Sequence, residues 1–273
     1  PQEGRQQLAA GGFKTYATMR DTSKASAVLE STAESDSLTI FPLDVQNTES
    51  VNQAIERIMQ TEGRIDLLIN NAGAGFVRTT EQATEAEIDW VMDVNYNGVV
   101  RCTKAVLPHM RSQRSGHIIN ITSVGGLVGQ PFNEFYCAAK FAVEGYTESL
   151  ASYVQPSFGI AFSLVEPGGI QTEFAKSALA QFAGGGGMTD DEYKPVLERY
   201  MGGAAARSAS GESASTYQTT AQASAVIMAC VNAENPPLRV RTSEWAESFT
   251  RLKTQADPDG TLLRDQVIAT FLS

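Results

Sequence analysis

The feature that most constrains the fold of this chain is the alternation of short, largely apolar runs with longer amphipathic patterns. The apolar runs have the length of strands and cover residues 13–19, 38–45, 65–70, 116–123, 159–167 and 238–243. Helical patterns lie between them at 23–35, 48–63, 84–112, 134–151 and 219–235. Strands that alternate with helices in this way predict a parallel sheet that is covered by helices on both faces. We therefore expect one α/β domain over residues 1–273, with a three-layer, doubly wound parallel sheet.

The beginning of the chain departs from the usual order of such a fold. A doubly wound nucleotide-binding fold begins with a strand that runs into a glycine-rich turn. Here the sequence opens within what reads as a helix, and Gly4, Gly11 and Gly12 do not form such a turn after a strand. We expect the first strand and its glycine-rich turn to be missing from the chain.

The composition excludes several classes of partner. The net charge is −10 and the isoelectric point is near 4.8, which argues against binding to nucleic acid or to an anionic membrane surface. No apolar run approaches the roughly 18 residues of a membrane-spanning helix, and no signal peptide is recognisable. The widely spaced Cys102, Cys137 and Cys230 favour a reducing cytoplasm over a disulfide framework. Only His109 and His117 are present, without a CxxC or HExxH motif, so we expect no metal site.

Two segments rich in Gly, Ala and Ser, 183–192 and 201–215, lie between the strand that ends at Pro167 and the helix expected from Thr219. They are part of a long stretch that we expect to be irregular. Such segments are typical of a disordered surface loop, but loops of this length also cover active sites. The second interpretation predicts a mobile substrate lid over residues 173–218.

Polar and glycine-rich motifs follow four of the expected strands. They are "LDV" at 43–45, "NNAG" at 70–73, "ITSVGG" at 121–126 and "EPGGIQT" at 166–172. The carboxyl ends of parallel strands meet at one edge of the sheet, where ligands of open α/β folds bind. These motifs therefore predict a binding crevice at that edge.

Tyr136 and Lys140 share one face of the helix over 134–151, and Ser123 ends the preceding strand. A tyrosine ordinarily has a pKa near ~10, and a neighbouring cation lowers it. Lys140 is that cation, and the Ser123 hydroxyl can orient a substrate carbonyl. These groups are what hydride transfer to a carbonyl requires: a proton donor and a polar clamp on the oxygen.

The strand at 13–19 is followed by Arg20 and then Asp21. In a dinucleotide site, an acidic residue near this position would bind the ribose 2′-hydroxyl, whereas an arginine accommodates a 2′-phosphate. Arg20 comes first, and Asp21 is free to cap the next helix. This order favours NADP over NAD.

Taken together, "NNAG" (70–73), Asn95, Ser123, "YCAAK" (136–140) and "PGGIQT" (167–172) resemble the short-chain dehydrogenase/reductase family. The resemblance runs from Gly12 to about Ser243. It implies that Tyr136 is the catalytic acid/base and that Ser123 positions the substrate oxygen. It also implies that Lys140 lowers the pKa of Tyr136 and binds the nicotinamide ribose.

The resemblance implies further contacts. Asn95 would hold a water in a proton relay with Lys140, although taken alone this asparagine also suits a helix kink that bonds to backbone. Besides Arg20, Tyr136 and Lys140, the cofactor-binding residues would be Asp44, Val45, Asn71, Ala72, Gly73, Pro167, Gly168, Ile170 and Thr172.

Within the family, "YATMRD", "SVGGLVGQPFNEFYCAAKFAVEGYTESLA" and "DPDG" are similar to the branch of 17β-hydroxysteroid dehydrogenase type 1 and the retinol dehydrogenases. That branch reduces hydrophobic ketones or aldehydes, usually with NADPH, as homodimers. The substrate-binding residues would then be Ser123, Gln130, Asn133 and Tyr136. The chain departs from the steroid enzyme at Gln130, where that branch has an apolar residue, and in 200–215, which contain no histidine.

The sequence thus predicts a cytoplasmic NADP(H)-dependent oxidoreductase, with NAD(H) possible, that acts on a hydrophobic, steroid- or retinoid-like ketone or aldehyde, or on the matching alcohol. We expect a homodimer or homotetramer. A non-catalytic dinucleotide-binding protein of the same fold is the alternative. A hydrolase that uses Ser123 is disfavoured, because GxSxG is absent and neither histidine has the context of a catalytic triad.

Overall fold

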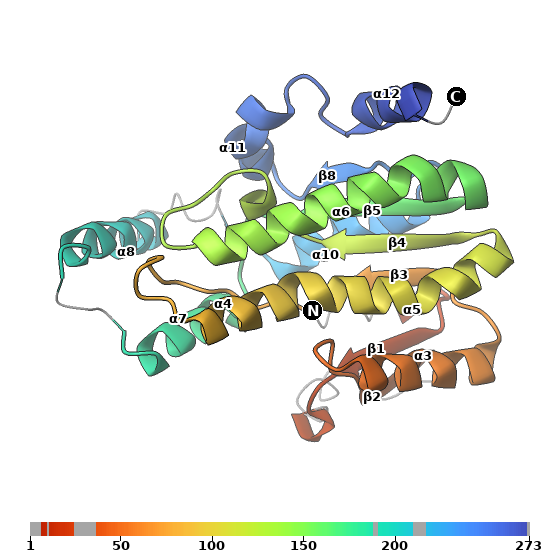
Figure 1. Cartoon of the computed structure of the whole chain (residues 1–273), viewed down its shortest axis with the longest axis horizontal. Coiled ribbons are helices and arrows are strands. Elements are labelled where there is room, and N and C mark those ends of the chain that lie inside the picture. The colour runs from red at the N-terminus through yellow and green to blue at the C-terminus, as the bar shows by residue number, and fades with distance from the viewer. Residues whose placement is uncertain (1–6, 10, 25–36, 188–190, 210–216, 272–273) are drawn as a thin grey trace.

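The computed structural model describes residues 7–9, 11–24, 37–187, 191–209 and 217–271. Its strands form three parallel sheets (Figure 1). The largest has the order β3-β4-β5-β8, with β3 Leu67–Asn70, β4 Gly116–Ile121, β5 Ile160–Glu166 and β8 Arg239–Arg241. Two smaller sheets pair β1 Thr15–Met19 with β2 Leu38–Pro42, and β6 Gly169–Ile170 with β7 Tyr217–Gln218.

The helices connect these strands and extend beyond them. They are η1 Thr22–Lys24, α3 Thr48–Glu62, α4 Glu85–Met92, η2 Asp93–Asn97, α5 Gly98–Gln113, η3 Val124–Gly126, α6 Glu134–Phe158, α7 Glu173–Gly184, α8 Lys194–Ala209, α10 Thr220–Asn232, α11 Glu244–Thr254 and α12 Thr261–Phe271.

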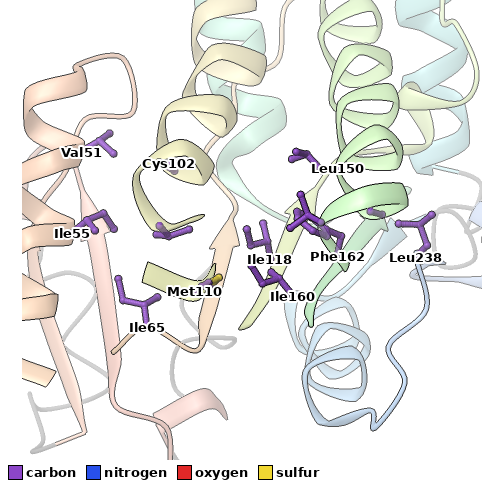
Figure 2. Packing of buried hydrophobic residues seen from close by; sticks show 13 residues of the cluster. Val51, Ile55, Ile65, Cys102, Met110, Ile118, Leu150, Ile160, Phe162 and Leu238 are labelled. Carbon is purple, nitrogen blue, oxygen red and sulfur yellow. The ribbon is translucent and has the colours of Figure 1, made fainter. Parts of the chain in front are cut away.

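Successive side chains of a strand point to opposite faces of the sheet. Consecutive residues of β4 and β5 are apolar, so both faces of the main sheet are apolar. Ile118 of β4 and Phe162 of β5 pack beneath α5 and α6, in a cluster that includes Leu150 of α6 (Figure 2). The neighbouring Ile119 and Val165 pack against α10 on the opposite face. The predicted α/β architecture, a parallel sheet between two helical layers, is therefore confirmed.

Local signals fix the ends of several predicted helices. The side chain of Asn47 accepts a hydrogen bond from the Ser50 N–H at the start of α3, and Gly63 ends this helix at a φ of 72°. A positive φ is easily reached by glycine, which explains why the helix stops there. The helix predicted over 48–63 is thus confirmed.

The expectation of a missing first strand and glycine-rich turn is not supported. The first strand that the structure shows is β1, which is the strand predicted over 13–19. Residues 7–9 before it are helical, and residues 1–6 lie outside the described residues. The expectation rested on the absence of a glycine-rich turn after an opening strand, whereas the structure pairs β1 with β2 in a separate two-stranded sheet. A cavity of about 580 Å³, lined by residues of β1 and β3, lies between the two sheets.

Three further segments differ from the expectation or extend it. The long pattern over 84–112 is helical, but η2 interrupts it with a π-helical segment. Most of the stretch expected to be irregular after Pro167 forms α7 and α8 instead. The helix expected over 23–35 falls mainly on residues 25–36, which lie outside the described residues. Within the described residues, no helix combines the length and apolar character needed to cross a membrane.

Candidate active site

Tyr136 and Ser123 meet at the carboxyl edge of the main sheet. Ser123 follows β4 with an extended backbone, and its hydroxyl accepts a hydrogen bond from the Gly125 N–H at 3.0 Å. Tyr136 lies in the first turn of α6, and its phenol is hydrogen-bonded with Ser123. The strand end and the helix start therefore bring together two hydroxyl groups that are thirteen residues apart in the sequence.

Lys140 lies one turn after Tyr136 and is only 4% exposed. Its Nζ donates a hydrogen bond to the Ile121 carbonyl at 3.1 Å and lies 5.8 Å from the centre of the Tyr136 ring. Burial lowers the pKa of Lys140 to about 8, and the charge of Glu144 acts in the opposite direction. The lysine is therefore still a cation at neutral pH.

The predicted direction of the Tyr136 pKa is wrong for this structure. The sequence predicts that Lys140 lowers the pKa of Tyr136, whereas burial raises it to about 12. The hydrogen bond with Ser123 lowers this pKa but does not outweigh the loss of hydration. At neutral pH Tyr136 therefore holds its proton and can act as a proton donor.

Asn95 is fully buried in η2, where its amide binds backbone groups. Its Nδ2 donates to the carbonyls of Ala74 at 3.0 Å and Val91 at 2.9 Å, and its Oδ1 accepts from the Ala74 N–H at 3.1 Å. The interpretation of Asn95 as a kink residue that bonds to backbone is therefore confirmed. The amide fixes the turn that follows β3 at the edge of the site.

That turn passes close to Asn95 and Lys140 because Gly73 has no side chain. A Cβ atom at Gly73 would lie 3.0 Å from Asn95 Oδ1 and 3.4 Å from Lys140 Nζ. The structure thus brings together Gly73, Asn95, Ser123, Tyr136 and Lys140, which the sequence analysis selected from four separate segments.

Several residues expected at the cofactor line the same edge of the molecule. Val45, Asn71 and Ala72 line the cavity between the two sheets. The Pro167 carbonyl accepts from the Val124 N–H at 2.9 Å, which joins the strand ends at β4 and β5. The carboxylate of Asp44 accepts from the Gln46 N–H at 3.0 Å and shapes the turn before α3.

The remaining predicted cofactor residues follow β1 and β5. Arg20 is exposed at the end of β1. Asp21 accepts hydrogen bonds from the backbone and side chain of Ser23, as expected of a capping residue. Gly168 lies close to the Trp245 ring, Ile170 belongs to β6, and Thr172 caps α7.

These residues fit a nicotinamide cofactor. The bond to Ile121 uses one of the three N–H donors of Lys140, which leaves donors for the hydroxyl groups of a ribose. Gly73 lets the turn after β3 approach both Lys140 and Asn95, so that a ligand can lie against backbone. The fit therefore rests on the Lys140 ammonium and on the turn at Gly73, which lie close together at the carboxyl ends of the strands.

Residues of α7, in the segment predicted as a lid, pack beside the site, and this contact was not predicted in detail. The Phe174 ring of α7 lies 5.9 Å from the Tyr136 ring, and a Cβ at Gly75 would be 2.8 Å from Ala178. Asn133, predicted to bind substrate, donates to the Tyr200 hydroxyl of α8 at 3.0 Å. Figure 1 shows α7 and α8 at the end of the molecule where α6 begins.

Two other residues near the site were missed. Arg78 is buried and donates to the Gly185 carbonyl at the end of α7, and no sequence signal marked this contact. Glu144 is buried one turn after Lys140, and its four-residue spacing from Lys140 could have drawn attention to it. Gln130, predicted to bind substrate, lies near Gly125, where a Cβ would be 3.3 Å from its Nε2.

The geometry does not support a hydrolase. His117 lies near the amino end of β4, whereas Ser123 follows the carboxyl end of this strand. The His117 ring is 2.9 Å from the Ser163 hydroxyl, and burial lowers its pKa to about 4. This histidine therefore cannot serve Ser123 as a general base.

The family model for short chain dehydrogenase matches residues 3–182. Human retinol dehydrogenase 8 is 38% identical over 265 residues, with 92% of this chain and 78% of that protein covered. Human 17-beta-hydroxysteroid dehydrogenase type 1 is 36% identical over 252 residues, with 91% and 74% covered. A 3-ketodihydrosphingosine reductase from Bacteroides thetaiotaomicron is 53% identical over 132 residues, with 48% of this chain and only 49% of that protein covered.

The fold has a matching counterpart among solved structures. A short-chain dehydrogenase from Streptomyces avermitilis superposes with a TM-score of 0.75 at 26% identity, over 98% of this chain and 92% of that one. The family and the branch predicted from the sequence are confirmed by these relatives. The chain belongs to the short-chain dehydrogenase/reductase family of oxidoreductases.

Proposed function

We propose that this protein is an NADP(H)-dependent oxidoreductase that reduces a hydrophobic ketone or aldehyde, or oxidises the matching alcohol. The observation that carries the proposal is the arrangement of Ser123, Tyr136 and Lys140 at one strand edge. Tyr136 keeps its proton at neutral pH while Lys140 keeps its charge, and this combination suits reduction.

Each side chain has a defined role in the proposed reaction. The bound cofactor supplies the hydride that adds to the carbonyl carbon. The Ser123 hydroxyl donates a hydrogen bond to the carbonyl oxygen and fixes its position. Tyr136 transfers its proton to the same oxygen, which completes the hydroxyl group of the product. The Lys140 ammonium stabilises the phenolate that remains on Tyr136.

The surroundings of Tyr136 support a hydrophobic substrate. Phe174 lies beside Tyr136, and Phe132 packs against Tyr200 at 5.5 Å between ring centres. The named relatives are called after retinol, a hydroxysteroid and a ketodihydrosphingosine, all of which are largely apolar molecules. We propose that residues 173–218 form a lid over this substrate.

The test is NADPH consumption by the purified protein with a panel of steroid, retinoid and long-chain ketones and aldehydes. Tyr136→Phe should lower kcat at least ~100-fold, because it removes the proton donor. Tyr153→Phe is the matched control, since Tyr153 is an exposed tyrosine of the same helix. Activity of Tyr136→Phe close to that of the wild type would refute the mechanism. Binding of NADPH without turnover of any substrate would favour a non-catalytic protein.

A further inference from the structure

Two consecutive glycines after β5 lie against aromatic rings from later parts of the chain. Gly168 and Gly169 follow Pro167 in the segment "PGGIQT". A Cβ atom at Gly168 would lie 2.9 Å from Cε3 and 3.0 Å from Cζ3 of Trp245. A Cβ atom at Gly169 would lie 2.6 Å from Cδ1 of Tyr217. Each glycine therefore leaves room for one ring.

The backbone of this pair does not itself call for glycine. Neither Gly168 nor Gly169 has a positive φ, so neither uses the backbone region that favours glycine. The requirement is spatial, because a methyl group at either position would overlap a ring. The loop after β5 and the two rings are thus in direct contact.

The two rings belong to elements that a buried polar pair joins. Tyr217 belongs to β7 and is opposite Gly169 of β6 in the parallel register. Trp245 lies in the first turn of α11. The side-chain amide of Gln218 donates to the Thr242 carbonyl and accepts from the Thr242 hydroxyl, and both residues are buried. This pair links the strand that carries Tyr217 to the start of the helix that carries Trp245.

A cleft of about 750 Å³ adjoins the two rings. Its lining includes Tyr217 and Trp245, whereas Gly168 and Gly169 do not line it. The rings therefore lie between the glycine pair and open space. The removal of a large side chain leaves a void into which its neighbours relax. If a ring were shortened, the loop would gain room to retreat toward the cleft.

The loop that carries the glycine pair passes beside Tyr136. At its start, the Pro167 carbonyl accepts a hydrogen bond from the Val124 N–H at 2.9 Å. At its end, Thr172 caps α7, and the Phe174 ring of this helix lies 5.9 Å from the Tyr136 ring. The loop therefore runs along the edge of the sheet at which we propose that the cofactor binds.

We propose that Trp245 and Tyr217 are positioning residues for the nicotinamide cofactor: their rings hold the backbone of Gly168 and Gly169 in place at the cofactor edge of the sheet. A loop binds a ligand more tightly when it is already ordered, because ordering it on binding costs free energy. Each ring acts through the glycine that it contacts. Since the rings act on cofactor binding, their role rests on the proposed function.

The experiment is a double-mutant cycle on the contact between Gly168 and Trp245. Titration calorimetry gives the Kd of NADPH for the wild type, Gly168→Ala, Trp245→Leu and the double variant. Trp245→Phe is the conservative variant, because it keeps an aromatic ring. Gly145→Ala is the control for the added methyl group. Gly145 is exposed on α6, and a Cβ there would lie within 4 Å of no neighbouring element in the described part of the chain.

Gly168→Ala should raise the Kd of NADPH roughly tenfold, because the methyl group displaces the loop from the Trp245 ring. Trp245→Leu should raise it about fivefold, because the loop can retreat, whereas Trp245→Phe and Gly145→Ala should stay near the wild type. In the double variant the methyl group occupies space that the ring has left. Its Kd should therefore return to within about threefold of the wild-type value.

The thermal unfolding midpoint of the same variants separates positioning from a structural role. A contact that only stabilises the fold would lower the midpoint and leave the Kd of NADPH unchanged, and this result would overturn the inference. Equal Kd values for Gly168→Ala and the double variant would also overturn it, because the methyl group would then act on the cofactor directly. If Trp245→Leu does not fold, the cycle of Gly169→Ala and Tyr217→Leu decides by the same criteria.

The wild type distinguishes a failure of this inference from a failure of the proposed function. If the wild type binds neither NADPH nor NADH, the proposed function fails and the role of the rings fails with it. If the wild type binds NADPH and the two cycles show no rescue, only the role of the rings fails.

Discussion

Tyr136 and Lys140 show how one environment acts oppositely on an acid and a base. Burial disfavours the charged form of each group, so it raises the pKa of Tyr136 to about 12 and lowers that of Lys140 to about 8. At neutral pH the pair is therefore a protonated phenol beside an ammonium ion. In the proposed reaction, this state lets Tyr136 donate a proton to the carbonyl oxygen.

Arg20 provides the prediction about cofactor choice. It is exposed at the end of β1, and Asp21 is held by Ser23, so the arginine is the residue available for a 2′-phosphate. We expect NADPH to bind more tightly than NADH. Arg20→Ala should weaken NADPH binding roughly tenfold, by about 1.4 kcal/mol, and leave NADH binding nearly unchanged. Titration calorimetry with both cofactors gives the values, and equal wild-type affinities would contradict the expectation.

At the residue scale, the sequence predicted which residues lie at the site better than it predicted how deeply they are buried. The spacing of Tyr136 and Lys140 is local, so it is visible in the sequence, and the structure brings Ser123 beside them. The direction of the Tyr136 pKa was wrong because burial comes from elements such as α7, whose packing is not visible in the sequence. The sequence does not show that Glu144 of α6 is paired, because its partner Arg239 lies on β8, where it also contacts Glu166 of β5.

At the element scale, the turn between β3 and α4 contacts α7 of the proposed lid. Arg78 donates to the Gly185 carbonyl, lies 3.4 Å from Glu87 and packs on the Phe182 ring at 5.6 Å. Nearby, Glu81 accepts from the Tyr193 hydroxyl at 2.8 Å. The carboxyl end of α7 and the residues between α7 and α8 are thereby tied to the segment that follows the NNAG turn.

Arg78→Ala should loosen α7 and raise KM for the carbonyl substrate. Loss of a buried charged donor to Gly185 removes about 1–2 kcal/mol of lid stabilisation, which corresponds to a rise in KM of roughly tenfold. Hydrogen exchange should increase in residues 173–187 but not in α5. Arg111→Ala, which changes an exposed arginine of α5, is the control. If KM and exchange in Arg78→Ala match those of the control, Arg78 does not hold the lid.

The helices of the lid were the elements that the sequence did not reveal. Glycine, alanine and serine around 183–192 and 201–215 give no amphipathic pattern, and glycine weakens helices intrinsically. Contacts with distant residues, such as that between Arg78 and Gly185, supply what local preference does not. By contrast, α3 was predicted because apolar periodicity and end signals lie within its own sequence, whereas the helix predicted over 134–151 continues to Phe158.

At the scale of the whole molecule, the buried carboxyl groups should make stability depend on pH. Glu166 has a pKa of about 8 in the folded protein, against an ordinary value of 4.5. A group whose pKa rises on folding takes up protons, so its stabilising effect is fully present below pH 4.5 and is lost as the pH rises through about 8. Glu166 should therefore lower the stability of the wild type across this range by a few kcal/mol, in order of magnitude, while His117, whose pKa burial lowers to about 4, acts in the opposite direction up to about pH 6.5.

Glu166→Gln stays neutral at every pH and should lose much less stability between pH 5 and pH 8. Urea unfolding at several pH values measures the difference, and Glu56→Gln, an exposed glutamate of α3, is the control. The comparison ends at pH 8 because Lys140, whose pKa is lowered, changes stability in the opposite direction above that pH. Parallel curves for the wild type and Glu166→Gln would show that Glu166 is already ionised.

The order of strands and helices was largely predictable, whereas the division of the sheet was not. Apolar runs predict strands such as β4 and β5 because both of their faces are covered by helices. The separation of β1 and β2 from β3 depends on which strand edges form hydrogen bonds, and no local pattern encodes that choice. The site was predictable where it follows strand ends and helix starts, because the topology itself places these together.

The π-helical segment Asp93–Asn97 makes the structure between α4 and α5 depend on the number of residues there more than on which residues they are. Such a segment holds one more residue than the α-helical turn it replaces. The flanking helices still direct the same side chains toward the core. A single-codon deletion there would let α4 and α5 join as one regular helix, with Val91 and Val99 still directed at the core. The deletion would remove the hydrogen bonds between the Asn95 amide and the Ala74 backbone. A single-residue deletion at this segment would therefore spare the fold and free the turn that follows β3.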